Sequence, residues 1–307
     1  MLSTARQQKE TGMKVGFIGV GNMGGPMCRN IIRNTNHQVT VFDLNPDAIA
    51  ACTALGAGAG TSVAQVATAC DVVFTSLPMP KHVEEVALGP NGIAASSRPG
   101  TVLIDLSTNS PATAKRVHEG AAVKGVAMLE APVSGGVPRA TDGTIVIMVG
   151  GDAAVFEAQL PLLKSFSKEV IHVGEVGMGS VAKLCNNMLA FCNAAAAAEA
   201  LMLGASAGID LHKLYDVICN ASGNSDAFRG LGPKAFKRDF KPGFALDLAH
   251  KDLRLALEMQ DEHGMPGMIA PQVMNLMRMA RAKGWGVDDS SSVLRVYEAA
   301  LGRELGG

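Results

Sequence analysis

The sequence lacks an excess of charge of either sign, and this absence narrows the range of partners. Charged residues make up 18% of the 307 residues, and the formal net charge is -1. Such a chain offers no electrostatic attraction to a nucleic acid or to an anionic membrane surface. We therefore expect neither of these partners and expect a small molecule to bind instead.

Paired cysteines and metal-ligand spacings are also missing. The six cysteines form no CxxC pair, and the seven histidines show no spacing with them that is typical of a metal site. We therefore expect reduced, mostly buried thiols and no bound metal. The cysteines are Cys28, Cys52, Cys70, Cys185, Cys192 and Cys219.

The chain lacks a long, uninterrupted apolar run as well. Its most apolar stretch, from Met188 to Ile209, contains Asn193 and Glu199, which favours a buried helix over a membrane span. The segment Met1 to Gly12 has neither the apolar run of a secretory signal nor the arginine-rich amphipathic pattern of a mitochondrial presequence. We interpret this segment as a disordered leader and expect a cytoplasmic protein.

What is present is a change of pattern along the chain. Up to about Gly174, short apolar runs alternate with helical segments, as is typical of a parallel sheet wrapped by helices. After Gly179 no further β-branched run bounded by turn residues occurs, so we expect only helices there. The expected strands are 14–18, 38–42, 71–76, 101–106, 126–130, 145–149 and 170–173, with crossover helices such as 46–55 and 111–123.

This pattern predicts an α/β fold with two domains. We expect a Rossmann-type, doubly wound sheet over residues 13–174 and an all-helical C-terminal domain over residues 175–307. The second domain should begin with a long interdomain helix, from Ser180 to about Ala207, which is apolar on all sides. Such a helix must be buried, between domains or between subunits, so we expect a homo-oligomer, either a dimer or a tetramer.

A glycine-rich turn, Gly19-Val20-Gly21-Asn22-Met23-Gly24, directly follows the first expected strand and opens a helix. This order is the context that the dinucleotide-binding fingerprint requires. In such a site Gly19 permits the tight turn, Gly21 lets the backbone approach the pyrophosphate, and Gly24 allows close packing of helix and strand. A chance cluster in a chain with 35 glycines is the alternative.

The second expected strand is followed by Asp43, nineteen positions beyond Gly24 and close to where a ribose-binding carboxylate is expected. This carboxylate would repel a 2'-phosphate, and the segment Leu44 to Pro46 supplies no cation, so the sequence predicts NAD rather than NADP. Asp43 could instead cap the helix that starts at Asn45 or Pro46.

Two later pairs of residues follow strands at the same edge of the sheet. Leu77 and Pro78 come after one strand, and Ser107 and Thr108 come after the next. Ligands of open α/β sheets bind at the carboxyl ends of the strands, so these residues are candidates for cofactor binding. Ordinary turn chemistry explains them equally well.

Three further motifs occur in order along the chain. They are APVSGGVPRATDG from Ala131 to Gly143, GMGSVAKLCNN from Gly177 to Asn187, and KDLRLA from Lys251 to Ala256. With the glycine turn, they make the chain resemble the β-hydroxyacid dehydrogenase family, the group that contains 3-hydroxyisobutyrate dehydrogenase and tartronate semialdehyde reductase. The resemblance extends from residue 13 to about residue 300.

The first of these motifs implies a binding site for the substrate. By resemblance, Ser134, Gly135 and Gly136 hold a substrate carboxylate. A hydroxyl group and unshielded backbone amides beyond the end of a strand can form a concave anion site. A glycine turn that only reverses the chain is the alternative. The expected partner is therefore a small molecule that bears a carboxylate.

The second motif places Lys183 inside the helix that should be buried. Lysine is rarely buried without a function, and burial lowers its pKa, which suits a group that takes or returns the hydroxyl proton of a substrate. Asn187 lies four residues on, on the same helical face, where its amide can hold the same substrate oxygen. The resemblance implies catalysis by both, and a lysine that reaches solvent from the helix start is the alternative.

The third motif implies that Lys251 reaches the cofactor from the helical domain. In the alternative interpretation, Lys251 faces solvent and pairs with Asp247 one turn earlier.

One segment departs from the family pattern. Residues Ser222 to Asp226 resemble a segment that lines the substrate pocket, where many members carry an aromatic residue at the position of Asp226. This carboxylate could bind the ammonium group of a 3-hydroxy amino acid. It could also face solvent or cap the following helix.

Together these assignments predict an NAD-dependent dehydrogenase that oxidises a small 3-hydroxy acid to its semialdehyde or keto acid, or catalyses the reverse reduction. Tartronate semialdehyde reductase and a serine- or threonine-type dehydrogenase are alternatives. Imine reductases share a similar fold but generally lack the lysine. A cofactor-binding module without catalysis would have lost Lys183, Asn187 or Ser134, and all three are intact.

Overall fold

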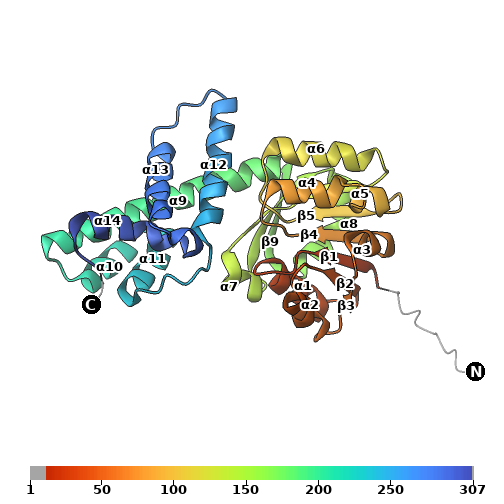
Figure 1. Ribbon diagram of the computed structural model, residues 1–307, viewed down its shortest axis with the longest axis horizontal. Helices are drawn as coiled ribbons and strands as arrows, with labels where there is room; N and C mark the ends of the chain where they lie inside the picture. Colours follow the sequence, from red (N-terminus) through yellow and green to blue (C-terminus); the bar gives the residue numbers. More distant parts are fainter. Residues whose placement is uncertain (1–11, 306–307) are drawn as a thin grey trace, which may run out of the picture. The chain divides into compact units, whose positions relative to one another are not determined.

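The computed structural model describes residues 12–305, so the leader expected over Met1 to Gly12 lies outside the described residues except for Gly12. The chain forms two compact units (Figure 1). The first unit extends to Ser107 and resumes from Pro111 to Gly179, and the second consists of Thr108–Ser110 and the chain from Ser180 onward. The chain therefore passes between the units at three peptide bonds.

The first unit is built on one mixed sheet of nine strands. Its order is β3-β2-β1-β4-β5-β6-β8-β7, and β9 pairs with β8. The strands from β3 to β6 are parallel, as expected, but β8 runs antiparallel to both β6 and β7, a change of direction that the sequence pattern did not indicate. The strands are β1 (Lys14–Ile18), β2 (Gln38–Phe42), β3 (Gly58–Ala59), β4 (Val72–Thr75), β5 (Val102–Asp105), β6 (Ala127–Glu130), β7 (Val133–Ser134), β8 (Ile145–Gly151) and β9 (Ser167–Gly174).

Helices cover both faces of this sheet, which confirms the doubly wound prediction. Successive strand residues point to opposite faces, so Phe17 and Phe74 lie in one buried cluster and Ile18 and Val73 in the other. The rings of Phe17 and Phe74 stack with their centroids 5.4 Å apart. The first face is covered by α1 (Gly24–Asn34), α2 (Pro46–Thr53), α7 (Gly136–Thr141) and α8 (Ala153–Lys164), and the second by α3 (Val63–Ala69), α4 (Pro80–Leu88), α5 (Ile93–Ser96) and α6 (Pro111–Ala122).

The second unit is all-helical, as predicted, and its long helix α9 spans Met178–Ala207. Two buried clusters pack on α9, one around Phe191 and one around Leu201. By length and composition alone α9 could cross a membrane, and 39% of its most apolar 18-residue stretch is buried inside the protein. Leu189 and Leu203 are 60% and 72% exposed, so one side of this helix is not covered within one chain, and its burial between subunits stays a prediction. The remaining elements are α10 (Leu211–Cys219), α11 (Asp226–Lys237), α12 (Leu246–Glu262), α13 (Ala270–Ala282), η1 (Trp285–Val287), η2 (Ser290–Val293) and α14 (Leu294–Leu301).

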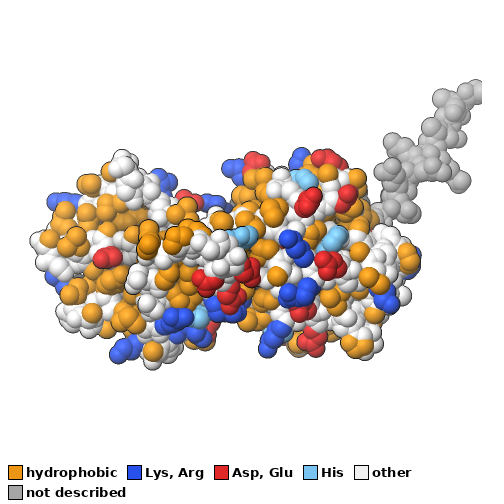
Figure 2. All heavy atoms as spheres, turned by 90° about the horizontal axis from the view of Figure 1, so that it is seen from above, with side chains coloured by type: hydrophobic (Ala, Val, Ile, Leu, Met, Phe, Trp, Pro, Cys, Tyr) orange, Lys and Arg blue, Asp and Glu red, His pale blue; other side chains and the backbone are white. Residues whose placement is uncertain are grey.

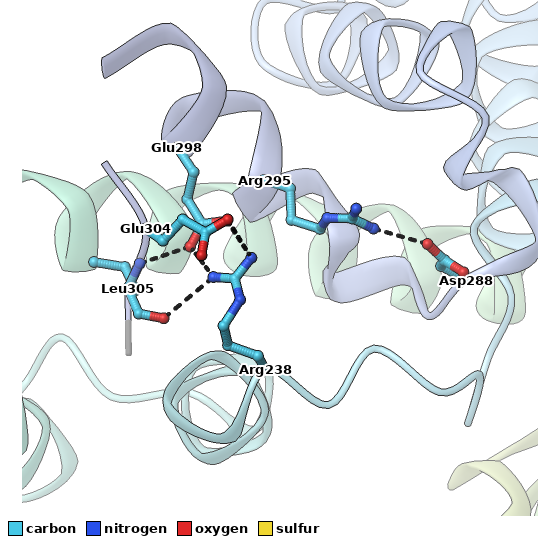
Figure 3. Close-up of polar contacts among 6 residues, drawn as sticks. All are labelled: Arg238, Asp288, Arg295, Glu298, Glu304 and Leu305. Carbon is cyan, nitrogen blue, oxygen red and sulfur yellow. Dashed lines mark hydrogen bonds and ion pairs between the residues drawn. The ribbon is translucent and has the colours of Figure 1, made fainter. Parts of the chain in front are cut away.

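An arginine at the end of α11 binds residues of α14 and of the segment that follows it (Figure 3). Arg238, the C-cap of α11, has a φ of 51°, in the left-handed region. Its guanidinium donates to Glu298 Oε1 at 2.8 Å and lies 3.2 Å from Glu304 Oε1. Leu305 N–H donates to the same Glu298 oxygen at 2.7 Å. Three segments of the helical unit therefore meet at one buried carboxylate.

Candidate active site

The glycine turn between β1 and α1 has the backbone geometry that close packing requires. Gly19 has a φ of 87°, a conformation that favours glycine. A Cβ on Gly24 would overlap the carbonyl oxygen of Gly19, and a Cβ on Gly21 would meet no atom within 4 Å. Gly19 and Gly24 therefore have the expected packing roles. The open space beside Gly21 suits the approach of a phosphate group.

Asp43 is bound both to this turn and to the residue that caps α2. Its Oδ2 accepts the amide hydrogen of Val20 at 2.8 Å, and its Oδ1 accepts that of Asn45 at 2.8 Å. The N-cap of α2 is Asn45, whose side chain accepts from Asp47 N–H. Each carboxylate oxygen has a further lone pair, so Asp43 can still accept ribose hydroxyls. These residues fit a dinucleotide.

Leu77 is held at the ends of β4 and β5 by a hydrogen-bond network. Its N–H donates to Ser107 Oγ at 2.9 Å, and Ser107 Oγ donates to Asp105 Oδ1 at 2.6 Å. The same carboxylate oxygen accepts from Thr75 Oγ1 at 2.7 Å. Asp105 thus fixes the backbone at Leu77, and Pro78 follows as an exposed residue.

The expected carboxylate-binding segment is a tight turn. Ser134 ends β7 and is partly buried. Gly135 and Gly136 follow with φ values of 134° and 66°, so both need glycine. The turn does reverse the chain into α7, and the side chain of Arg139 lies against Gly135, where a Cβ would come within 2.7 Å of it. Binding of a carboxylate by this segment stays a prediction.

Lys183 and Asn187 form a buried pair on α9. Lys183 is 8% exposed, and its Nζ donates to Asn187 Oδ1 at 2.9 Å. Burial lowers the pKa of Lys183 to about 8, while the charge of Asp252 raises it and that of Lys251 lowers it. The side chain therefore does not reach solvent as a lysine at a helix start could. At neutral pH it can exchange a proton within a small free-energy difference.

Asp252, on α12, orients this pair, a role that the sequence motifs did not reveal. Its Oδ2 accepts from Asn187 Nδ2 at 2.7 Å, and the residue is 2% exposed. A carboxylate can only accept, so the amide must turn its nitrogen to Asp252 and its oxygen to Lys183. Asp252 directly follows Lys251 in the KDLRLA motif, and this position was the one sign in the sequence that could have identified it.

Lys251 is buried beside Asp252 and is not paired with Asp247. Its Nζ lies 3.0 Å from Asp252 Oδ1 and donates to the carbonyl oxygen of Thr108 at 3.1 Å. Asp247 instead accepts from Arg281 at 2.6 Å. Two residues assigned to the cofactor, Thr108 and Lys251, are thus in direct contact, and the solvent-facing alternative for Lys251 is wrong.

Asp226 lies at the start of a helix. It is exposed and is the first residue of α11. Ser225 caps this helix, since its hydroxyl accepts from Phe228 N–H at 3.0 Å. A carboxylate in the first turn also interacts favourably with the helix dipole. Binding of a substrate ammonium group by Asp226 stays a prediction.

The site residues fall into two groups, one in each unit. The α/β unit holds the glycine turn, Asp43, Leu77, Pro78 and the Ser134 segment, and the helical unit holds Thr108, Lys183, Asn187 and Lys251. Within residues 12–305, no group of three or more His, Cys, Asp or Glu side chains is arranged to hold a metal ion. The first group can bind a nucleotide and an anion, and the second can exchange a proton.

Two family models match the chain. The NAD binding domain of 6-phosphogluconate dehydrogenase matches residues 14–174. The model described as NAD-binding of NADP-dependent 3-hydroxyisobutyrate dehydrogenase matches residues 177–297. The similarity to known dehydrogenases therefore includes both units.

Individual relatives match over almost their whole length. The 2-(hydroxymethyl)glutarate dehydrogenase of Eubacterium barkeri is 40% identical over 299 residues, which are 97% of this chain and 99% of the relative. The 3-hydroxyisobutyrate dehydrogenase of Pseudomonas aeruginosa is 39% identical and covers 92% of this chain and 98% of its own. Among solved structures, Mycobacterium tuberculosis 3-hydroxyisobutyrate dehydrogenase with L-serine has a TM-score of 0.84 at 34% identity, with 93% of this chain and 99% of that chain covered.

Proposed function

This chain belongs to the β-hydroxyacid dehydrogenase family, and from that premise we propose that it oxidises a small 3-hydroxy acid to its semialdehyde or keto acid with NAD, or catalyses the reverse reduction. It is an NAD-binding oxidoreductase. The observation that carries the proposed reaction is the buried Lys183, whose pKa is lowered to about 8 and whose Nζ is held by Asn187.

Lys183 acts as the base during oxidation. Its neutral amine accepts the proton of the substrate hydroxyl, and in the reduction its ammonium form returns this proton. Asn187 holds the amine in place and binds the same substrate oxygen. Because Asp252 fixes the Asn187 amide, the Asn187 amide and the Lys183 amine are already oriented for the substrate oxygen before the substrate binds.

The cofactor is bound by the glycine turn from Gly19 to Gly24 and by Asp43, with Leu77, Pro78, Thr108 and Lys251 as further contacts. Asp43 receives the ribose hydroxyls and disfavours a 2'-phosphate, and Leu44 beside it is exposed and uncharged. When bound, NAD supplies the acceptor for the hydride that leaves the substrate carbon.

Ser134, Gly135 and Gly136 bind the substrate carboxylate. Their support is the match of this segment to the family motif, together with the turn of two glycines with positive φ at the end of β7, a geometry in which backbone amides can form an anion site. A 3-hydroxy amino acid is the second candidate substrate, because the related Mycobacterium tuberculosis enzyme was solved with L-serine. In that case Asp226 binds the ammonium group.

One assay tests the proposal. The purified protein is given 3-hydroxy acids, 3-hydroxy amino acids and short semialdehydes, each with NAD(H) and NADP(H), and absorbance of the reduced cofactor is followed. We expect turnover of a 3-hydroxy acid with a higher kcat/KM for NAD. Lys183→Ala should lose at least about 100-fold in kcat while it still binds NADH. Retained turnover in this variant, or no turnover of any compound by the wild type, contradicts the proposal.

We also infer a soluble, cytoplasmic homo-oligomer that uses neither nucleic acid nor membrane as a partner. The support for association between copies is α9, whose Leu189, Ala196 and Leu203 are exposed at a spacing of seven residues and so lie along one face of the helix. On the face shown in Figure 2, hydrophobic side chains are exposed over much of the helical unit. A second copy of the chain can cover this face of α9.

A further inference from the structure

Glu130 is a buried carboxylate that neither the sequence motifs nor the proposed reaction uses. It ends β6, is 2% exposed, and stands immediately before the segment that contains Ser134. Its Oε1 accepts the amide hydrogen of Gly177 and, at 2.9 Å, that of Gly179. A carboxylate removed from water in this way is stable only because it receives such hydrogen bonds.

The residues around this contact are glycines because a side chain would not fit there. A Cβ on Gly150 would lie 2.5 Å from Glu130 Oε1 and 2.9 Å from Gly179 N, and a Cβ on Gly179 would lie 2.8 Å from the carbonyl oxygen of Met148. Gly177 has a φ of 103°, which favours glycine. Small residues here let the start of α9 approach β6 and β8 closely enough for the carboxylate to bind two amides.

The two amides that donate to Glu130 lie at the start of the helix that carries the base, that of Gly177 directly before the helix and that of Gly179 in its first turn. Met178 begins α9, and Gly179 is its second residue. Gly179, Lys183 and Asn187 follow one another at intervals of four residues, so they lie on one face of the helix. A negative charge at the start of a helix also interacts favourably with the positive end of the helix dipole, and this strengthens the contact.

We propose that Glu130 is a positioning residue for the reaction, because its carboxylate fixes the first turn of α9 at the end of β6 and so fixes the part of the helix from which Lys183 projects. The proposal rests on the function proposed above for Lys183. Glu130 acts through the backbone and touches neither substrate nor cofactor. Its loss should therefore impair the chemical step without changing the pKa that governs it.

The test compares two variants that disturb this contact in different ways. Glu130→Gln keeps the shape but removes the charge, and Gly150→Ala keeps the charge but pushes on the carboxylate oxygen. We expect kcat to fall by about 10- to 100-fold in each, since small displacements of a reacting group cost rates of this size. The isotope effect on kcat with substrate deuterated at the hydroxyl-bearing carbon should rise, and the midpoint of the pH profile should stay near the wild-type value.

A matched control separates positioning of α9 from the mere removal of a charge at the start of a helix. Asp152 accepts the amide hydrogens of Ala154 and Val155, each at 2.9 Å, at the start of α8 in the same unit. Asp152→Asn makes the same chemical change as Glu130→Gln at a helix that carries no assigned catalytic residue. We expect little change in Tm, because asparagine caps a helix about as well as aspartate, and a kcat within about twofold of wild type. NADH binding, followed by fluorescence, establishes that the α/β unit of each variant is folded.

The outcomes distinguish this inference from the proposed function. If Glu130→Gln and Gly150→Ala lose no more kcat than Asp152→Asn, or if their losses come with an unchanged isotope effect, Glu130 has only a structural role. If Lys183→Ala retains turnover, the proposed function fails whatever the Glu130 variants do. Should Glu130→Gln not bind NADH, the Gly150→Ala result alone decides, because its carboxylate is intact.

Discussion

Lys183 experiences opposing influences on its pKa, and their balance sets the pH range of activity. Burial lowers the pKa to about 8, Asp252 raises it, and Lys251 lowers it. Oxidation needs the neutral amine, so kcat/KM for oxidation should rise as the pH increases through about 8 and then level off. Reduction needs the ammonium form, so its kcat/KM should fall over the same range.

Asp252→Asn tests the contribution of this charge. The asparagine oxygen can still accept from Asn187, but the negative charge that favours the ammonium form is gone, so the pKa of Lys183 should be lower. The rising limb of the oxidation profile should therefore move to lower pH. Asp247→Asn, which changes an exposed carboxylate on the same helix, serves as the control. A midpoint that stays or moves upward for Asp252→Asn would show that Asp252 does not stabilise the charged lysine.

Residues that a motif brings together could be predicted, whereas those that only the fold brings together could not. Lys183 and Asn187 lie in one helical segment, so their spacing alone indicates a shared face. The contact of Asp252 with Asn187 spans 65 positions, and that of Glu130 with Gly179 spans 49. A carboxylate that will be buried has no local pattern that distinguishes it from one at the surface.

Among the elements, strands of four or more residues could be recognised, whereas two-residue strands and the direction of a strand could not. All seven expected strands are present, with ends shifted by at most three residues, because continuous apolar runs are typical of strands buried on both faces. Strands β3 and β7 have two residues each and carry no periodic signal. The antiparallel direction of β8 was also missed, since an apolar strand shows the same pattern in either direction.

The end of α11 offers a prediction in which two effects oppose each other (Figure 3). In Arg238→Gly, glycine adopts the left-handed backbone conformation without strain, which should raise the free energy of unfolding by about 1 kcal/mol. The buried Glu298 loses its cation, which should lower the free energy of unfolding by about 3 kcal/mol. We expect a net loss of about 2 kcal/mol and a Tm lower by a few degrees, measured by differential scanning calorimetry. Arg238→Lys keeps a cation and should lose less. An unchanged or higher Tm for the glycine variant would show that the ion pair contributes little.

At the scale of the whole molecule, the exposed face of α9 predicts the association state. Leu189→Asp combined with Leu203→Asp places charges on the face that a second copy should cover, and such a change disfavours association strongly. Light scattering after size exclusion should give a dimer or tetramer for the wild type and the mass of one chain for this variant. Val123→Asp, at an exposed position of the α/β unit, should leave the assembly intact. A monomeric wild type would contradict the inference.

Because the chain passes between the two units three times, recombination cannot exchange one unit as a single continuous stretch of the gene. A single crossing would let recombination exchange the C-terminal half as one continuous piece. Here the segment Thr108–Ser110, encoded within the N-terminal half, belongs to the helical unit and supplies the carbonyl oxygen that accepts from Lys251. A helical unit transferred from Ser180 onward would arrive without this partner, and its Lys251 would depend on the segment after β5 of the recipient. The two halves of the sequence are therefore expected to be inherited together.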